Sequence, residues 1–305
     1  MRKLLSRYKA LFIVAAAVVF WLGFTFFANA ASPVLGTIYA SSAQYGHAHT
    51  YQSSGIDPTI GGTTTIHING YVTDTDGVSD TSGWTIRGTF YRSSISGASG
   101  CSADNNNCYV IANGTCATRV VNSTTLEYDC PVAVEYYADA TDTGSAYASD
   151  TWNPWMYASD GTGGFDMDFK VAGVKPEYNT KLGLSIPDTI NYGNLANNTS
   201  TTSANNQVQT ITQQGNDVAD VEVSGLDLTC TSGTIPIGNT QWSLTDVGYN
   251  GTGTTALTSS STDTNLNVGL QTNGLITKNL YWDILIPYDV YGTCSGNTTI
   301  TAVAH

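Results

Sequence analysis

Apolar and polar residues alternate along several short stretches of the chain after residue 60. In residues 63–74, Ile66, Ile68 and Val72 share one face of an extended chain, while His67 and Tyr71 share the other. This alternation is typical of antiparallel strands with one buried face, and it predicts a strand. The same interpretation applies to residues 84–92, 131–138, 165–172, 182–186, 208–214, 219–225, 241–247, 280–287 and 298–304.

The pattern predicts an all-β fold with two antiparallel, immunoglobulin-like (Ig-like) β-sandwich domains in series. Gly, Asp and Asn clusters separate the alternating stretches, as turns require, and no useful window has apolar residues at helical spacing. Residues 172–181 lose the alternation and contain Pro176, so we place a linker at 175–181. The expected domains are then 61–174, with four cysteines, and 182–305, with one disulfide.

Residues 31–60 show little periodicity, although they carry Ile38, Tyr39, Tyr45 and Tyr51. We interpret them as an extended N-terminal arm that adds to the open sheet edge of a neighbouring molecule. The alternatives are an idle leader and a first strand that pairs within its own domain.

The first 30 residues have the layout of a secretory signal peptide. A basic start with Arg2, Lys3, Arg7 and Lys9 precedes an apolar run over 10–27 and the small-x-small tripeptide at 28–30. We expect cleavage after Ala30. The alternative is an uncleaved segment that anchors the chain in a membrane, which is the one membrane contact that we expect.

Charge and composition narrow the classes of partner. The formal charge of −13 becomes −17 without residues 1–30, because seven basic and 24 acidic side chains then remain. A chain this acidic repels phosphate backbones, so we expect no nucleic-acid partner. Low Lys and Glu content argues against long surface helices, and abundant Thr, Val, Ile and Tyr favour strands.

The six cysteines all follow residue 30, and an even number in an exported chain predicts disulfides. Cys230 and Cys294 have no nearby rivals, so we pair them with each other. Three pairings are open to the other four cysteines, and we favour Cys101–Cys108 with Cys116–Cys130, since residues 101–108 read as a pinned loop.

One acidic loop is a candidate metal site. Asp74, Asp76 and Asp80 stand at alternate positions around Gly77, and calcium prefers several carboxylate oxygens. The loop is not an EF-hand, and we favour a surface turn whose Asp side chains cap backbone N–H groups. Calcium is the single cofactor considered. Further acidic ligands for it are Asp139, Asp142, Asp160, Asp166 and Asp168.

Histidines and aromatic residues give weaker candidates. His47 and His49 would share one side of a strand, where both could hold a metal, but no third ligand is evident. In the segment 151–157, the rings of Trp152, Trp155 and Tyr157 could stack on sugars or anchor a protein partner. We favour a corner that covers the end of the core.

Several motifs resemble known modules. The N-terminal half resembles Ig-like modules of bacterial cell-surface proteins at GYVTDTDGVSD (70–80) and at residues 136–152. The C-terminal half resembles a second type of secreted bacterial β-sandwich module at residues 190–201, 221–228 and 282–304. The resemblance implies a fold and a location at the cell surface, and it implies no catalytic residues.

The sequence predicts a structural protein, not an enzyme. It contains no GxSxG elbow, no HExxH helix and no phosphate-binding glycine loop. We expect an extracellular or cell-surface coat, filament or matrix subunit that binds itself or other surface proteins. The alternative is a carbohydrate-binding or adhesin module that binds glycans.

Overall fold

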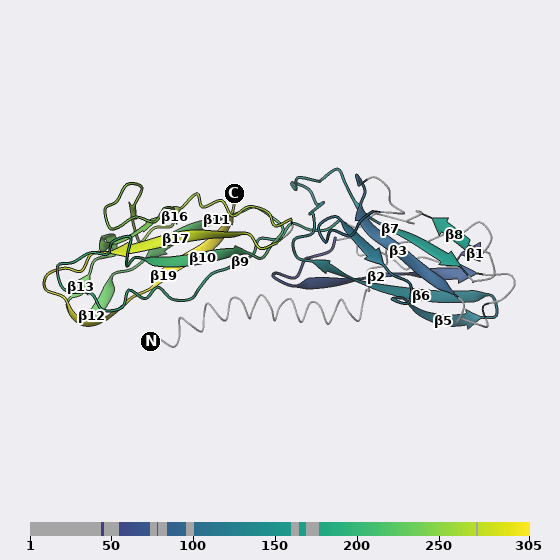
Figure 1. The fold of residues 1–305 in the computed structure, drawn as a ribbon, viewed down its shortest axis with the longest axis horizontal. Helices are drawn as coiled ribbons and strands as arrows, with labels where there is room; N and C mark the ends of the chain where they lie inside the picture. The colour runs from purple at the N-terminus through teal and green to yellow at the C-terminus, as the bar shows by residue number, and fades with distance from the viewer. Residues whose placement is uncertain are drawn as a thin grey trace. The chain divides into compact units, whose positions relative to one another are not determined.

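The computed structural model describes residues 44–45, 55–73, 78, 84–95, 101–159, 165–168, 177–272 and 274–305. These residues form antiparallel β-sheets, one 3-10 turn and no α-helix (Figure 1). No helix within them is long and apolar enough to span a bilayer. The predicted signal peptide and calcium loop, His47 and His49, and most of the arm lie outside the described residues.

The described chain divides into two compact units, each containing antiparallel sheets. Unit 1 takes in 65–134 and 147–178 together with the chain up to Ile56. Unit 2 takes in residues 57–64, 135–146 and 179–305. Two short segments of the N-terminal half therefore pack with the C-terminal half, whereas the sequence pattern assigns them to the arm and to the first domain.

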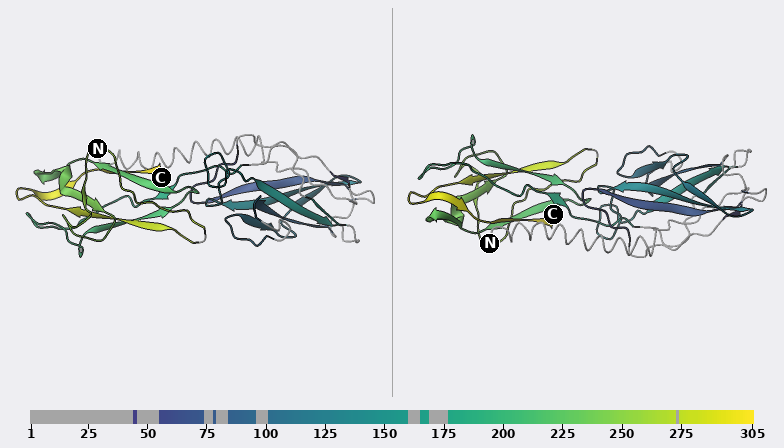
Figure 2. Two further views of the ribbon diagram at one scale, coloured as in Figure 1. Left: turned by 90° about the horizontal axis from the view of Figure 1, so that it is seen from above. Right: turned by 90° about the horizontal axis from the view of Figure 1, so that it is seen from below.

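Unit 1 has two four-stranded sheets, in the orders β1-β2-β6-β5 and β4-β3-β7-β8 (Figures 1 and 2). Their strands are β1 (Gln44–Tyr45), β2 (Thr63–Thr73), β3 (Thr85–Arg92), β4 (Cys108–Ile111), β5 (Ala117–Asn122), β6 (Thr125–Glu135), β7 (Trp152–Ser159) and β8 (Phe165–Asp168). Within the arm, Gln44 and Tyr45 pair with Thr73 and Val72 of β2 in the same chain.

Alternation along the strands builds the core of unit 1. Ile66 and Ile68 on β2 are buried, and the alternate residues of β6 from Leu126 to Val134 are buried as well. From the other sheet, Phe90 on β3 and Trp152 on β7 are fully buried, and their rings stack with centroids 5.0 Å apart. Burial of such large side chains supplies the main stabilisation of a fold of this kind.

Unit 2 contains sheets in the orders β15-β14-β17-β10-β9, β16-β11-β19 and β13-β12-β18. Their elements are β9 (Leu184–Ser185), β10 (Gln207–Gln213), β11 (Ala219–Gly225), β12 (Leu228–Ser232), β13 (Thr234–Ile235), η2 (Ile237–Asn239), β14 (Thr240–Ser243), β15 (Thr255–Ala256), β16 (Thr262–Asp263), β17 (Thr277–Ile284), β18 (Tyr291–Ser295) and β19 (Thr298–Ala304). Trp242 and Trp282 pack with Ile211, Val221 and Val223 in its main core.

Unit 2 holds its two N-terminal segments by specific hydrogen bonds. Tyr136 donates its hydroxyl to Gln271 Oε1 at 2.6 Å, and Asn216 Nδ2 donates to the Ala138 carbonyl at 3.1 Å. The Gly61 amide donates to the Gln214 carbonyl at 2.8 Å. Gly61 has a φ of +65°, a left-handed backbone conformation that favours glycine.

Candidate functional site

Three disulfides staple the sheets. They join Cys101 to Cys108, Cys116 to Cys130, and Cys230 to Cys294, and the described residues include no free cysteine. Cys230 and Cys294 face each other on the adjacent strands β12 and β18. Covalent bonds of this kind restrict the unfolded chain, which is how a disulfide stabilises a small β domain.

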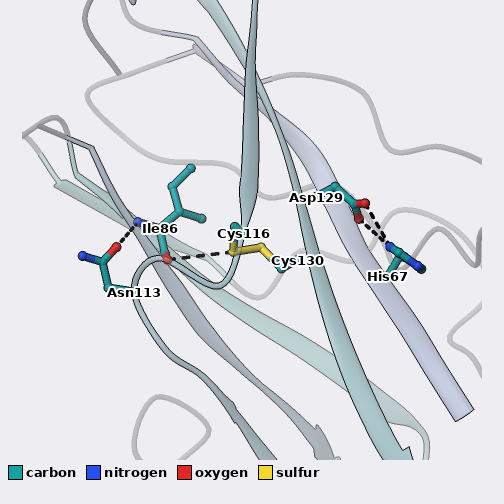
Figure 3. The surroundings of a disulfide bond; sticks show 6 residues. All are labelled: His67, Ile86, Asn113, Cys116, Asp129 and Cys130. Atoms are coloured by element: carbon teal, nitrogen blue, oxygen red, sulfur yellow. Dashed lines mark hydrogen bonds and ion pairs between the residues drawn. A yellow bond between two sulfur atoms is a disulfide. The ribbon is translucent and has the colours of Figure 1, made fainter. Parts of the chain in front are cut away.

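The Cys116–Cys130 bond fastens the turn before β5 to β6 (Figure 3). In the same turn, Asn113 Oδ1 accepts the Ile86 amide at 3.2 Å, and Cys116 Sγ lies 3.9 Å from the Ile86 carbonyl oxygen. Residues of both sheets of unit 1 therefore meet at this turn, because Ile86 belongs to β3.

A histidine–carboxylate pair, His67 and Asp129, joins β2 to β6 close to this disulfide. His67 Nδ1 lies 3.0 and 2.9 Å from the two carboxylate oxygens of Asp129 (Figure 3). The hydrogen bond from Asp129 raises the pKa of His67 above its ordinary value of 6.5, although partial burial opposes the rise. On the neighbouring strands, Arg119 Nε donates to Glu127 Oε2 at 2.8 Å. This surface carries charges of both signs and, among its described residues, no nucleophile–base pair.

The aromatic segment 151–157 lies mainly in the interior. Trp152 is fully buried and Trp155 is 5% exposed, so neither ring offers a face for stacking on a sugar. Tyr157 is half-buried, and the Arg87 guanidinium lies 4.7 Å from its ring centroid. These rings therefore stabilise unit 1. The expected corner is wrong, because the segment forms the inner strand β7, between β3 and β8.

The predicted acidic ligands do not gather into a site that the structure describes. Asp139 is buried, while Asp142 accepts the Thr180 hydroxyl at 2.6 Å. Within the described ranges, no three His, Cys, Asp or Glu residues come together to hold a metal ion. Asp74, Asp76, Asp80 and Asp160, and the side chains of Asp166 and Asp168, lie outside the description.

His305 lies beside a carboxylate that the sequence gives no reason to single out. Its Nδ1 is 3.2 Å from Asp220 Oδ2, and Asp220 is only 2% exposed. Burial by itself would raise the pKa of Asp220, but N–H donation from Val221 and Leu266 and the hydrogen bond with His305 lower it overall. Asp220 thus organises the backbone of unit 2 from inside, a structural role.

A second buried carboxylate lies on β17. Asp283 is fully buried, and its Oδ1 accepts the Thr201 hydroxyl at 2.7 Å. Its Oδ2 has no hydrogen-bond partner among the described residues. Burial raises the pKa of Asp283, the Thr201 hydroxyl opposes the rise, and the charge of Asp246 adds to it. Sequence reasoning missed this residue because Asp283 occupies the polar phase of an alternating strand, the phase expected to face water.

One hollow of about 200 Å³ opens between β4 and the second half of β6. Its lining mixes polar with apolar side chains: Asn105, Tyr109 and Thr115 lie beside Val110, Ile111, Pro131 and Val132. Strand β5 pairs with β6 only over Thr125–Asp129, so this part of β6 has no strand of the described chain on that side.

The sheet edges of the described chain differ greatly in protection. Edge strands β1, β9, β13, β15 and β16 have two residues each. The six-residue edge β5 carries the Arg119–Glu127 ion pair and a register shift. In contrast, β19 pairs with β11 without a break over all seven residues, and it contains no charged residue, proline or glycine. Natural edges usually carry such protection against pairing with other chains.

Comparison with known proteins adds little. No family model matches the chain, and no curated protein matches it either. One similar solved structure is a chain from "Chaperone-tip adhesin complex is vital for synergistic activation of CFA/I fimbriae biogenesis". The similarity covers 90% of this chain and 83% of that chain, at 10% sequence identity and a TM-score of 0.30. A similarity at this TM-score carries no argument about function.

Proposed function

We propose that this chain is a structural cell-surface protein that acts by associating with itself or with other surface proteins. The observation that carries the proposal is the disulfide-stapled, all-β architecture, in which β19 has no second neighbouring strand among the described residues. Disulfides persist in oxidising compartments outside the cytoplasm, which fits the export signal expected from the sequence.

The strand order supports an Ig-like assignment for unit 1. In an Ig-like sandwich, one sheet has the order A-B-E-D and the other contains C-F-G, extended by C′ in some members. The orders β1-β2-β6-β5 and β4-β3-β7-β8 correspond to A-B-E-D and C′-C-F-G. Unit 1 differs in its disulfide, since Cys116–Cys130 lies beside β5 and β6 instead of joining the two sheets as the B–F bridge does in antibodies.

An adhesin or carbohydrate-binding module is the second candidate. The hollow between β4 and β6 favours it, because small ligands bind in concave sites where polar groups stand among apolar side chains. The burial of Trp152 and Trp155 weighs against it, since the expected sugar-stacking planes are covered. We also retain the proposal that the protein is not an enzyme.

Sedimentation velocity and negative-stain microscopy of the purified chain test the proposal. A structural subunit forms oligomers or filaments as its concentration rises, without any added ligand. A chain that stays monomeric at all concentrations and binds a glycan array contradicts the structural role and supports the adhesin module.

A further inference from the structure

We propose that the open edge of β19 is a docking strand for the β19 of a second copy, so that two chains share one continuous antiparallel sheet. The inference rests on the proposed self-association and assigns it to one strand. The order across the contact would be β11-β19-β19-β11, with a two-fold axis near Thr301.

In the part of the chain that the structure describes, the sheet ends at β19, and the burial pattern reflects this. Ile300 and Ala302 point to the core side with their cross-strand partners Val223 and Val221. Val223 is 1% and Val221 is 0% exposed, whereas Ile300 and Ala302 are only half-buried. Side chains on the core face of a strand remain half-exposed when no strand covers them from the open side. An added strand would complete their burial.

The composition of β19 suits pairing with another strand. Thr299 and Thr301 on its outer face are exposed, and β-branched residues favour a pleated, half-buried surface. The strand has none of the charges, prolines or bulges that normally block edge pairing, in contrast to β5. Its seven residues give about the usual length of a strand in a sheet.

Symmetry and charge together favour a second copy as the occupant. When two identical strands pair antiparallel about a two-fold axis normal to the sheet, core-facing residues meet core-facing residues. Both chains are strongly acidic, but the two facing strands carry no charge. The nearest carboxylate of this outer face is Glu222 on β11. The Glu222 carboxylates of the two copies would be three strand spacings apart, about 14 Å, which exceeds the Debye length of about 8 Å at physiological salt.

The test uses the full chain and the double variant Thr299→Glu/Thr301→Glu. The carboxylate introduced at position 301 would lie opposite Glu222 in its own sheet and opposite the same introduced carboxylate of the second copy. Four carboxylates would then form a row across the contact. Like charges directly opposite each other destabilise strand pairing, and we expect dimerisation to weaken about tenfold or more. The matched control is Thr63→Glu/Thr65→Glu, which has the same spacing and charge on exposed positions of β2, a strand outside the proposed contact.

Two measurements read the result. Sedimentation velocity gives the dimerisation constant, and hydrogen exchange reports whether β19 amides gain protection as the concentration of the wild-type chain rises. We expect the β19 amides of the wild-type chain to gain protection as the concentration rises. The β19 variant should lose association, and the control variant should associate as the wild type does. Circular dichroism checks folding. If the double variant unfolds, Thr299→Glu alone serves, because Ser224 lies opposite it and no carboxylate does.

Three results would overturn the proposal. If the wild-type chain stays monomeric, the proposed β19 contact does not exist. The proposal that the chain assembles with other surface proteins is not affected by that result. Equal association of both double variants shows that the chain self-associates through another surface, which leaves the proposed function intact. If deletion of residues 31–43 abolishes the concentration-dependent protection of β19, the occupant is the N-terminal arm.

Discussion

Removal of the Cys230–Cys294 disulfide should lower the free energy of unfolding of unit 2. The loss should exceed the loss that unit 1 suffers when either of its own disulfides is removed. The perturbation is the double substitution Cys230→Ala/Cys294→Ala. The bond connects facing residues of β12 and β18 and spans a sequence separation of 64. The chain segment inside this loop contains β13 to β17, including the central strand of the five-stranded sheet.

The magnitude follows from the loop that each bond closes. The chain-entropy relation gives about 4.3 kcal/mol for a separation of 64 and about 2.4 kcal/mol for the separation of 7 between Cys101 and Cys108. Cys230 is 8% exposed and packs with Ile235 and Ile284, so the alanine adds a small packing loss. The short-loop double variant Cys101→Ala/Cys108→Ala is therefore the matched control, with an expected difference of about 2 kcal/mol.

The assay must report on one unit at a time, because both units contain tryptophan and total fluorescence mixes their transitions. Native-state hydrogen exchange in low urea gives the opening free energy of β17 amides in unit 2 and of β3 amides in unit 1. We expect the long-loop deletion to lower the β17 value and leave the β3 value nearly unchanged. Equal losses from the two deletions, or a β17 loss below about 1 kcal/mol, would refute the entropic argument.

Three further predictions concern an ion pair, a buried carboxylate and the acidic loop. The His67–Asp129 pair should contribute about 0–1 kcal/mol to the free energy of unfolding, in full below pH 6.5 and less as pH rises through the raised pKa of His67. Urea unfolding of the wild type and of His67→Gln at pH 5.5 and 8.5 checks this. Equal losses of stability at both pH values would contradict it. Asp283→Asn should raise the free energy of unfolding by about 1 kcal/mol at pH 7, because a buried carboxylate with a raised pKa costs stability above pH 3.8. Urea unfolding at pH 7 and pH 3.8 checks this. A gain that persists unchanged at pH 3.8 would exclude the titration of Asp283 as its cause. If the chain binds calcium, Asp76→Ala should weaken the binding measured by calorimetry, and unchanged binding would exclude this loop.

The sequence predicted the all-β class because its central strands carry regular alternation. Strands β2, β3, β10, β11, β17 and β19 coincide with predicted stretches to within a few residues. Each of them packs an apolar face on a core, so its pattern reflects the burial directly. The even cysteine count likewise predicted disulfides, which the structure contains.

The edge strands β5 and β18 escaped prediction because nothing on them is deeply buried. All six residues of β5 are exposed, and most of β18 is exposed or half-buried, so neither has an apolar face to read. The N-terminal half of β6 could have been found. Leu126, Tyr128 and Cys130 extend the alternation of Val132 and Val134 backward, provided that tyrosine and cysteine are counted as buried residues.

Buried polar side chains are the part of the structure that alternation cannot reveal. Gln213 is fully buried and donates to the carbonyl of Gly269, and Asp220 accepts the backbone N–H of Leu266. Their partners lie on loops that approach only in the folded chain. A pattern of residue types along one strand carries no information about such distant partners.

The two N-terminal segments that pack in unit 2, residues 57–64 and 135–146, delay the folding of unit 2 during synthesis on the ribosome. Tyr136 leaves the ribosome 135 residues before its hydrogen-bond partner Gln271. At synthesis rates of about 5–20 residues per second, that interval lasts roughly 7 to 27 seconds. Until synthesis passes Asn179, residues 57–64 and 135–146 have only each other to pack against, since the rest of unit 2 begins there. A ribosome that stalls between these points therefore leaves a nascent chain with unpaired ends, which would be a ready target for holdase chaperones and for quality-control proteases.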